Sequence, residues 1–381
     1  MSGGKWIGLL IAAAAALHTP WAGAQIDPKQ RTYLQGGTEF PLRGNGPLLG
    51  YGFLLINRPH ILSQDDYLRL ATAGAYTRVD WIHDNVPFKN QALGIGLAGG
   101  VFSNNFYDYK RGVYLPEQSF RGHTAGIALS YFAHPYKIMG RIPVNFEVRV
   151  APTYLMYRRM PRTNPQFVPP ADGVVYTYRV GLRIGGVPPV LAPSRALELT
   201  LWYEADHRTH AGPYGLHDDE LSTKPWTTRG WMDLGGIFPL PHGQVASLFY
   251  SMGATGQADP LDLFRVGGSL RFHDRFPLQL HGYYENEIFA SDYRLVNAFY
   301  RFPLIPGQRR LMLQLNFDYA HIRYFPGYAL PHRDLIGLGA DVIYDWSRAV
   351  RIVTGYGYGP GAPRDGGYGA SAVNLRLQMK L

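Results

Sequence analysis

Apolar and polar residues alternate along most of the chain. The last eight residues, NLRLQMKL, have Leu or Met at every odd position from 375 to 381, and Arg376, Gln378 and Lys380 lie between them. A period of two residues predicts a β-strand with one apolar and one polar face. Similar stretches occur at 93–101, 144–150, 175–184 and 197–203, and none keeps the period of an amphipathic helix. The pattern therefore predicts an all-β fold.

The connections between these stretches distinguish a membrane barrel from a soluble sandwich. Long connections near 103–122, 158–173 and 208–225 alternate with shorter ones near 134–142, 186–194 and 239–243. Long loops at one end and short turns at the other are typical of a bacterial outer-membrane barrel. Aromatic residues at expected strand ends, such as Trp231 and Trp346, favour interfacial girdles. We predict a transmembrane antiparallel β-barrel of about 16 strands, or about 14 if the ambiguous segment 257–290 adds none.

The first residues have the pattern of an export signal. Lys5 precedes an apolar run from Trp6 to Leu17, and small residues follow at 22–24. Such a run is too short to cross a bilayer as a helix. We expect a signal peptide at 1–24, a short periplasmic segment at 25–45 and an outer-membrane barrel domain at 46–381. The chain has no cysteine, so disulfides contribute to none of these parts.

The end of the chain is expected to close the barrel. An unpaired strand edge inside lipid is too costly, because its backbone groups have no partners there. We therefore expect 374–381 to pair with the first strand, taken as 47–57. The apolar face of this last strand would meet outer-membrane lipid, and its polar face would meet the lumen.

The formal net charge is +9, but its distribution argues against a nucleic-acid partner. Lys and Arg are dispersed, and the chain lacks a compact basic cluster. On the alternating strands, the face that would line the lumen carries Arg149, Arg179, Arg183, Arg376 and Lys380. A basic lumen wall suits a passive, porin-like channel for small anionic solutes, which is one functional hypothesis.

The last third of the chain resembles a known group of barrels. The segment LFRVGGSLRFHDRFPLQLHGYYENEIFASDYRLVNAFYRFPL (263–304) is similar to the lid-loop region of the bacterial surface-antigen barrels, the superfamily of BamA, TamA and the FhaC transporters. The segment LMLQLNFDYAHIR (311–323) resembles the family's strand with a lumen acid, here Asp318. The resemblance implies insertion or translocation of protein or lipid at the outer membrane. Family members usually carry periplasmic POTRA domains; lacking them, this barrel would depend on a separate periplasmic protein or act alone.

The resemblance also assigns residues to the lid loop. In the family, an arginine of a V-R-G-[FY]-type tetrad is the partner of the lumen acid. The tetrad most like it here is Leu280-His281-Gly282-Tyr283, with His for Arg, and the other candidate is Arg271. We favour Arg271 as the partner of Asp318, because a guanidinium stays charged and can bond a carboxylate bidentately. The alternative is an Asp318 that contacts only water or wall residues.

Signals for catalysis or metal binding are weak. The segment 207–220 is rich in His and acidic residues that could ligate a metal. Nothing in it fixes a ligand geometry, so we expect solvated loop residues and no metal. The chain contains no G-x-S-x-G motif. We therefore expect no catalytic residues, no enzymatic activity and no cofactor.

Overall fold

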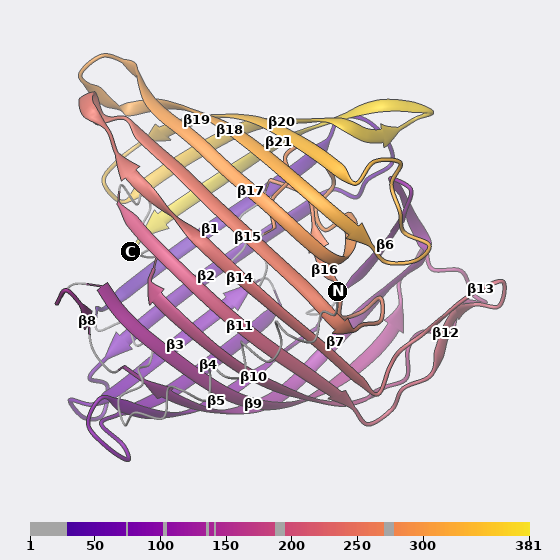
Figure 1. Ribbon diagram of the computed structural model, residues 1–381, viewed down its shortest axis with the longest axis horizontal. Helices are drawn as coiled ribbons and strands as arrows, with labels where there is room; N and C mark the ends of the chain where they lie inside the picture. The colour runs from indigo at the N-terminus through magenta and orange to yellow at the C-terminus, as the bar shows by residue number, and fades with distance from the viewer. Residues whose placement is uncertain are drawn as a thin grey trace, which may run out of the picture.

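The computed structural model describes residues 29–73, 75–101, 105–134, 137–140, 142–186, 195–269 and 278–381. Within these residues, sixteen long strands form one closed antiparallel barrel (Figure 1). Its wall strands are β1 (Arg31–Pro41), β2 (Leu49–Pro59), β3 (Asp66–Ala73), β4 (Tyr76–Asp84), β5 (Gln91–Gly100), β7 (Val113–Ala133), β9 (Ile142–Arg159), β10 (Gly173–Gly185), β11 (Ala196–Arg208), β14 (Trp226–Pro239), β15 (Val245–Gln257), β17 (Ile288–Ile305), β18 (Gln308–Tyr324), β19 (Asp334–Asp345), β20 (Val350–Arg364) and β21 (Gly367–Lys380). Each wall strand pairs with its neighbours in the chain, and β21 pairs with β1.

The remaining elements lie in the connections. Short strands β6 (Phe106–Lys110), β12 (Pro213–Leu216) and β13 (Asp219–Ser222) belong to long loops, and β16 (Phe264–Val266) lies between β15 and β17. These long loops lie at one end of the barrel. β8 (Lys137–Ile138) and the 3-10 turn Pro241–Gly243 lie at the other end, which also holds the C-terminus (Figure 1). No helix among the described residues is long and apolar enough to cross a membrane. The two unlike ends match the predicted alternation of loops and turns, and the long-loop end is the extracellular one.

The two faces of each strand differ as the sequence predicts. On β18, the outward side chains of Leu315 and Phe317 are 46% and 44% exposed, whereas those of Asn316 and Asp318 are 8% and 2% exposed. On β21, Leu375 is exposed and Arg376 is buried inside the barrel. The outward side chains form the apolar belt that meets lipid, and the polar positions line the lumen.

The barrel begins earlier in the chain than we expected. Residues 31–41, assigned above to a periplasmic segment, form β1, which pairs with β2 and with β21. The strand escapes a pattern search because Thr32, Gly36 and Thr38 interrupt its outward face, and only Leu34 and Phe40 on that face are large and apolar. The last strand thus closes the barrel as predicted, but against β1 and not against 47–57.

The predicted count of sixteen strands is confirmed, but the segment 257–290 does not supply the wall strands that the prediction assumed. Within its described part, this segment forms only the three-residue β16 between the ends of β15 and β17. It adds no wall strand, and β1 supplies the strand needed for an even number. The described residues of 258–287 instead fold inward.

Candidate functional site

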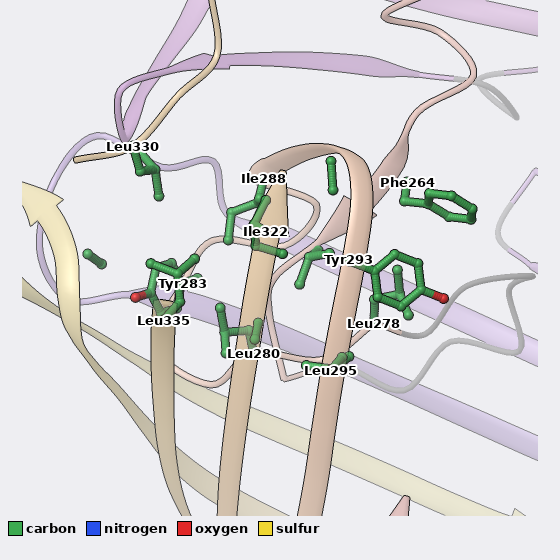
Figure 2. Close-up of a cluster of buried hydrophobic side chains, with 14 of the residues drawn as sticks. Phe264, Leu278, Leu280, Tyr283, Ile288, Tyr293, Leu295, Ile322, Leu330 and Leu335 are labelled. Atoms are coloured by element: carbon green, nitrogen blue, oxygen red, sulfur yellow. The ribbon is translucent and has the colours of Figure 1, made fainter. Parts of the chain in front are cut away.

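The connection between β15 and β17, residues 258–287, is called the inner loop here. Among its described residues, Leu278, Leu280 and Tyr283 are buried, and they belong to a cluster with Phe264, Tyr293 and Leu295 (Figure 2). The loop bonds to lumen-facing residues of β1, β18 and β21 and, through Asp262, to Arg208 of β11, which lies half-way around the ring from β1. A segment with partners on several sides of the wall must occupy the lumen. The inner loop is therefore a plug built from the chain itself.

The tip of the inner loop binds the predicted lumen acid. Asp318 Oδ2 accepts a hydrogen bond from the backbone N–H of His281 at 2.8 Å and contacts His281 Nδ1 at 2.5 Å. Asn297 of β17 donates to Asp318 Oδ1 at 2.7 Å and to the carbonyl oxygen of Gln279 at 3.0 Å. Both His281 and Asp318 are almost fully buried. A buried carboxylate with this many donors fixes the position of the tip.

Gly282 lets the tip lie flat against the wall. Its φ is +86°, and a Cβ at this position would lie 2.1 Å from the backbone nitrogen of Gly359. Only glycine combines that conformation with so close an approach. This explains the glycine of the tetrad in physical terms.

The part of the wall that contacts the tip also carries glycines. On β19, a Cβ at Gly337 would lie 2.7 Å from His281 N, and a Cβ at Gly339 would lie 2.5 Å from His281 Cδ2. On β20, a Cβ at Gly359 would lie 2.7 Å from the ring of Tyr283. We call Gly337, Gly339, Gly357 and Gly359 the glycine track. Larger residues there would push the inner loop away from Asp318.

A second attachment joins the inner loop to both strands that close the barrel. Ser269 donates its backbone N–H to Glu39 Oε2 of β1 at 2.9 Å, and its hydroxyl contacts the same oxygen. Asn374 of β21 donates to Ser269 Oγ at 3.0 Å. All three residues are buried. The loop therefore contacts the β1–β21 seam from the inside.

A third attachment holds the extracellular base of the inner loop. Glu287 and Arg364 of β20 form a bidentate ion pair with distances of 2.9 and 2.6 Å, and both side chains are at most 1% exposed. The guanidinium of Arg364 also lies 3.7 Å from the ring centre of Tyr284. Tyr284 in turn donates its hydroxyl to the carbonyl oxygen of Arg43 at 3.0 Å. A buried pair with these added contacts is costly to separate.

An aromatic cover lies over this base at the loop end of the barrel. Phe106 of β6 lies between Phe120 and Phe289, with ring centres 4.9 and 5.5 Å away. Arg265 stacks on Phe289 at 3.5 Å. Nearby, burial raises the pKa of Asp108 in β6 to about 6, although Lys110 and Arg265 partly offset this increase. Packed side chains therefore lie over the inner loop at the extracellular mouth.

The predicted lumen cations face inward, but most of them have partners. Arg149 lies 3.3 Å from Asp80, Arg183 lies 2.8 Å from Glu198 and Arg376 lies 3.0 Å from Asp341. Each carboxylate offsets the charge of its arginine. The wall is therefore charge-matched at Arg183 and Arg376, whereas Asp80 is shared by Arg149, Arg69 and Arg78 and leaves an excess of positive charge at that place.

The other two predicted cations differ from these. The Arg179 guanidinium stacks over Trp202 at 4.1 Å and lies 5.5 Å from the Trp231 ring centre. Trp231 is 6% exposed and faces the lumen, so its prediction as a girdle residue is wrong. Lys380 is exposed at the C-terminal end of β21. These positions leave no continuous cationic lining among the five predicted residues.

The structure brings four predicted site residues together: His281, Gly282, Tyr283 and Asp318. Arg271, which we favoured as the partner of Asp318, lies outside the described residues, and His281 is the residue bonded to Asp318. Sequence reasoning missed the glycine track. Its signal was alternate glycines at lumen positions of two neighbouring strands, which indicates a close approach by another backbone.

The described part of 207–220 holds no metal site. His207 stacks on Trp226 with ring centres 4.5 Å apart, and Asp219 is bonded to Lys110 and Gln118. Among the described residues, no group of three or more His, Asp or Glu side chains is arranged to hold a metal ion.

A closed barrel with an apolar belt and a lumen plugged by its own loop defines a class: a transmembrane protein of the bacterial outer membrane. No protein-family model and no curated protein matches the sequence. Among solved structures, CdiB from Acinetobacter baumannii is similar, with a TM-score of 0.59 and 10% sequence identity over 93% of this chain and 60% of that chain. BamA from Haemophilus ducreyi, in a form lacking POTRA domains 1–3, has a TM-score of 0.59 and 11% identity over 93% of this chain and 71% of that chain.

CdiB from Escherichia coli is similar as well, with a TM-score of 0.57 and 10% identity over 91% of this chain and 63% of that chain. The chain thus spans about three fifths of the CdiB structures that it matches. At these identities the likeness establishes the fold. The fold implied by the resemblance to surface-antigen barrels is therefore confirmed, as a barrel of the BamA and CdiB type.

Proposed function

We propose that this barrel inserts or translocates proteins or lipids at the outer membrane, with the inner loop as a plug that moves during transfer. The observation that carries this proposal is the attachment of one loop to both Asp318 and the β1–β21 seam. Because the same segment fills the lumen and binds the closing strands, its displacement would open the lumen and release contacts at the seam together. A permanently open pore would not need a loop that fills its lumen and binds its closing strands.

Passive diffusion of anionic solutes is less well supported. It depends on a lumen lined by excess positive charge, whereas Arg183 and Arg376 each lie beside a carboxylate and the excess at Asp80, shared by three arginines, is local. The plug and the aromatic cover would also obstruct flow. In this proposal a separate periplasmic protein delivers the cargo.

A reversible lock of the inner loop tests the proposal. The chain contains no cysteine, so the double variant Ser269→Cys/Asn374→Cys carries its only two thiols. The native Ser269 Oγ and Asn374 Nδ2 atoms are 3.0 Å apart. A cysteine at 374 is one bond shorter than asparagine, so the loop must move toward β21 by about that length for the two sulfurs to join. Oxidation would bind the loop to β21, and reduction would free it.

The readout is the protein and lipid composition of the outer membrane in cells that depend on the double variant. We expect oxidising medium to deplete a subset of outer-membrane proteins, exported proteins or outer-membrane lipids, and reductant to restore them. The reduced variant is the matched control for the substitutions themselves. If composition is the same in both states while solute uptake follows the redox state, the barrel is a channel and the proposal fails.

A further inference from the structure

The lipid-facing wall carries a hollow near the extracellular end. Its volume is about 240 Å³, and its lining comes from three neighbouring strands, β15, β17 and β18: Tyr250, Arg294, Val296, Tyr319 and His321. These side chains point outward, because their neighbours Leu295, Ala320 and Ile322 are buried inside the barrel. The hollow is therefore separate from the lumen and from the inner loop.

The hollow lies at the upper edge of the apolar belt. Register places Arg294 beside His321, and Val296 beside Tyr319 one step nearer the membrane centre. Ile336 lies beside Tyr319 in register, and Phe317 and Leu338 lie one step below; all three are 40–44% exposed on the outer wall. Along the outer face of β17 and β18, the residues change from Val296 and Tyr319 to Arg294 and His321 in a single step toward the extracellular end. This height corresponds to the headgroup region of the outer leaflet.

Arg323, Asp292 and Asp334 near the hollow each have a bonded partner, and Arg294 has none among the contacts of the described residues. Arg323 lies 2.5 Å from Asp292, and Asp334 is bonded to His321 at 2.9 Å and to Tyr319 at 2.6 Å. Among the contacts of the described residues, the exposed Arg294 has no hydrogen bond and no ion pair. An unmatched guanidinium at a concave site favours an anion, and phosphate suits its planar donors.

We propose that this hollow binds a phosphorylated lipid of the outer leaflet. Arg294 holds a phosphate of the headgroup, and His321 lies beside it in register. The rings of Tyr250 and Tyr319 lie at the level of the headgroup and upper acyl chains, where amphipathic rings are favoured. The acyl chains continue down the belt along Phe317 and Leu338. This proposal goes beyond plug function and does not depend on it.

The test uses the whole barrel in phosphatidylcholine nanodiscs doped with diphosphorylated lipid A, and native mass spectrometry counts the bound lipid. The variant is Arg294→Gln, and the matched control is Arg310→Gln, an exposed arginine beside the β17–β18 turn at the periplasmic end. We expect Arg294→Gln to weaken lipid A binding about tenfold or more, because a charge-assisted hydrogen bond to phosphate is lost. Arg310→Gln should bind as the unmodified protein does.

Two further probes decide the chemistry. Lipid A without phosphates should bind no better to the unmodified protein than to Arg294→Gln, and phosphatidylglycerol should not replace lipid A at equal charge. The proposal is overturned if Arg294→Gln keeps full binding, if Arg310→Gln loses as much, or if phosphatidylglycerol binds equally well. Heat-modifiable gel mobility of each variant confirms that the barrel is folded.

Discussion

Removal of the Asp318 carboxylate should release the tip of the inner loop. In Asp318→Ala, His281 N–H, the His281 ring and Asn297 all lose the acceptor that lies within 2.8 Å of each. Breaking a buried, hydrogen-bonded pair by deleting one partner costs about 3–5 kcal/mol. If the loop is released as a unit, the ratio of open to closed plug rises by about two to three and a half orders of magnitude, at about 1.4 kcal/mol per tenfold.

The assay is single-channel recording in planar bilayers. We expect Asp318→Ala to raise the open probability strongly and His281→Ala to raise it less, because the backbone N–H of residue 281 still reaches Asp318. The double variant should match Asp318→Ala alone, since residues that act on one contact are not additive. Asp233→Ala is the control, because Asp233 is also a lumen carboxylate but is bonded to Thr200 and Ser251 of the wall.

Several results would refute this reasoning. If Asp318→Ala and Asp233→Ala change conductance equally, the effect is loss of a lumen charge and not release of the plug. If the effects of Asp318→Ala and His281→Ala add, the two residues act independently. If neither variant changes the open probability, the tip contact does not hold the plug.

Three other variants test separate parts of the account. Gly282→Ala should raise the open probability, because a Cβ there meets Gly359 N at 2.1 Å, whereas Gly52→Ala, with nothing within 4 Å of its Cβ, should not. Val148→Arg should impair assembly by about 2–4 kcal/mol near the bilayer midplane, while Glu147→Arg on the lumen side should assemble normally; equal folded yields on gels would contradict the assigned faces. For Asp108, the raised pKa of about 6 means that the aromatic cover is most stable below the ordinary carboxyl pKa and weakens as pH rises through 6. Asp108→Asn should remove this dependence of stability on pH. The measurement is the temperature at which the folded gel band disappears, taken at several values from pH 4 to pH 7.5. If the variant and the unmodified protein give the same profile, Asp108 does not cause the dependence.

Much of the wall could be predicted because one physical rule governs it. A strand in lipid must be apolar outside and paired at both edges, so its alternation is visible in single segments such as 374–381. β1 is the exception, since its pairing with β2 and β21 supplies the stability that its weak outward face does not indicate. β1 could be assigned as a wall strand only from its pairing in the closed ring, and the residue pattern of 31–41 alone does not indicate that pairing.

The site was only partly predictable, for a different reason. Asp318 and the tetrad 280–283 could be found from a resemblance in residue order, but the choice of Arg271 over His281 weighed charge above position in that tetrad. In the structure His281 contacts Asp318, because Gly282 lets the backbone approach the track and brings the preceding residue to that carboxylate; Arg271 lies outside the described residues. The function of the track glycines depends on a loop about 50 to 80 residues away in sequence, and no pattern within β19 or β20 identifies that partner.

The most direct test of the central claim, a lumen closed by a movable loop of the same chain, is a recording from Ser269→Cys/Asn374→Cys in one bilayer, first oxidised and then reduced. The account predicts a closed barrel under oxidant and brief, frequent openings after reductant is added, with the unmodified protein unaffected by either. A steady open pore of the same conductance in both redox states would show that the inner loop does not close the lumen.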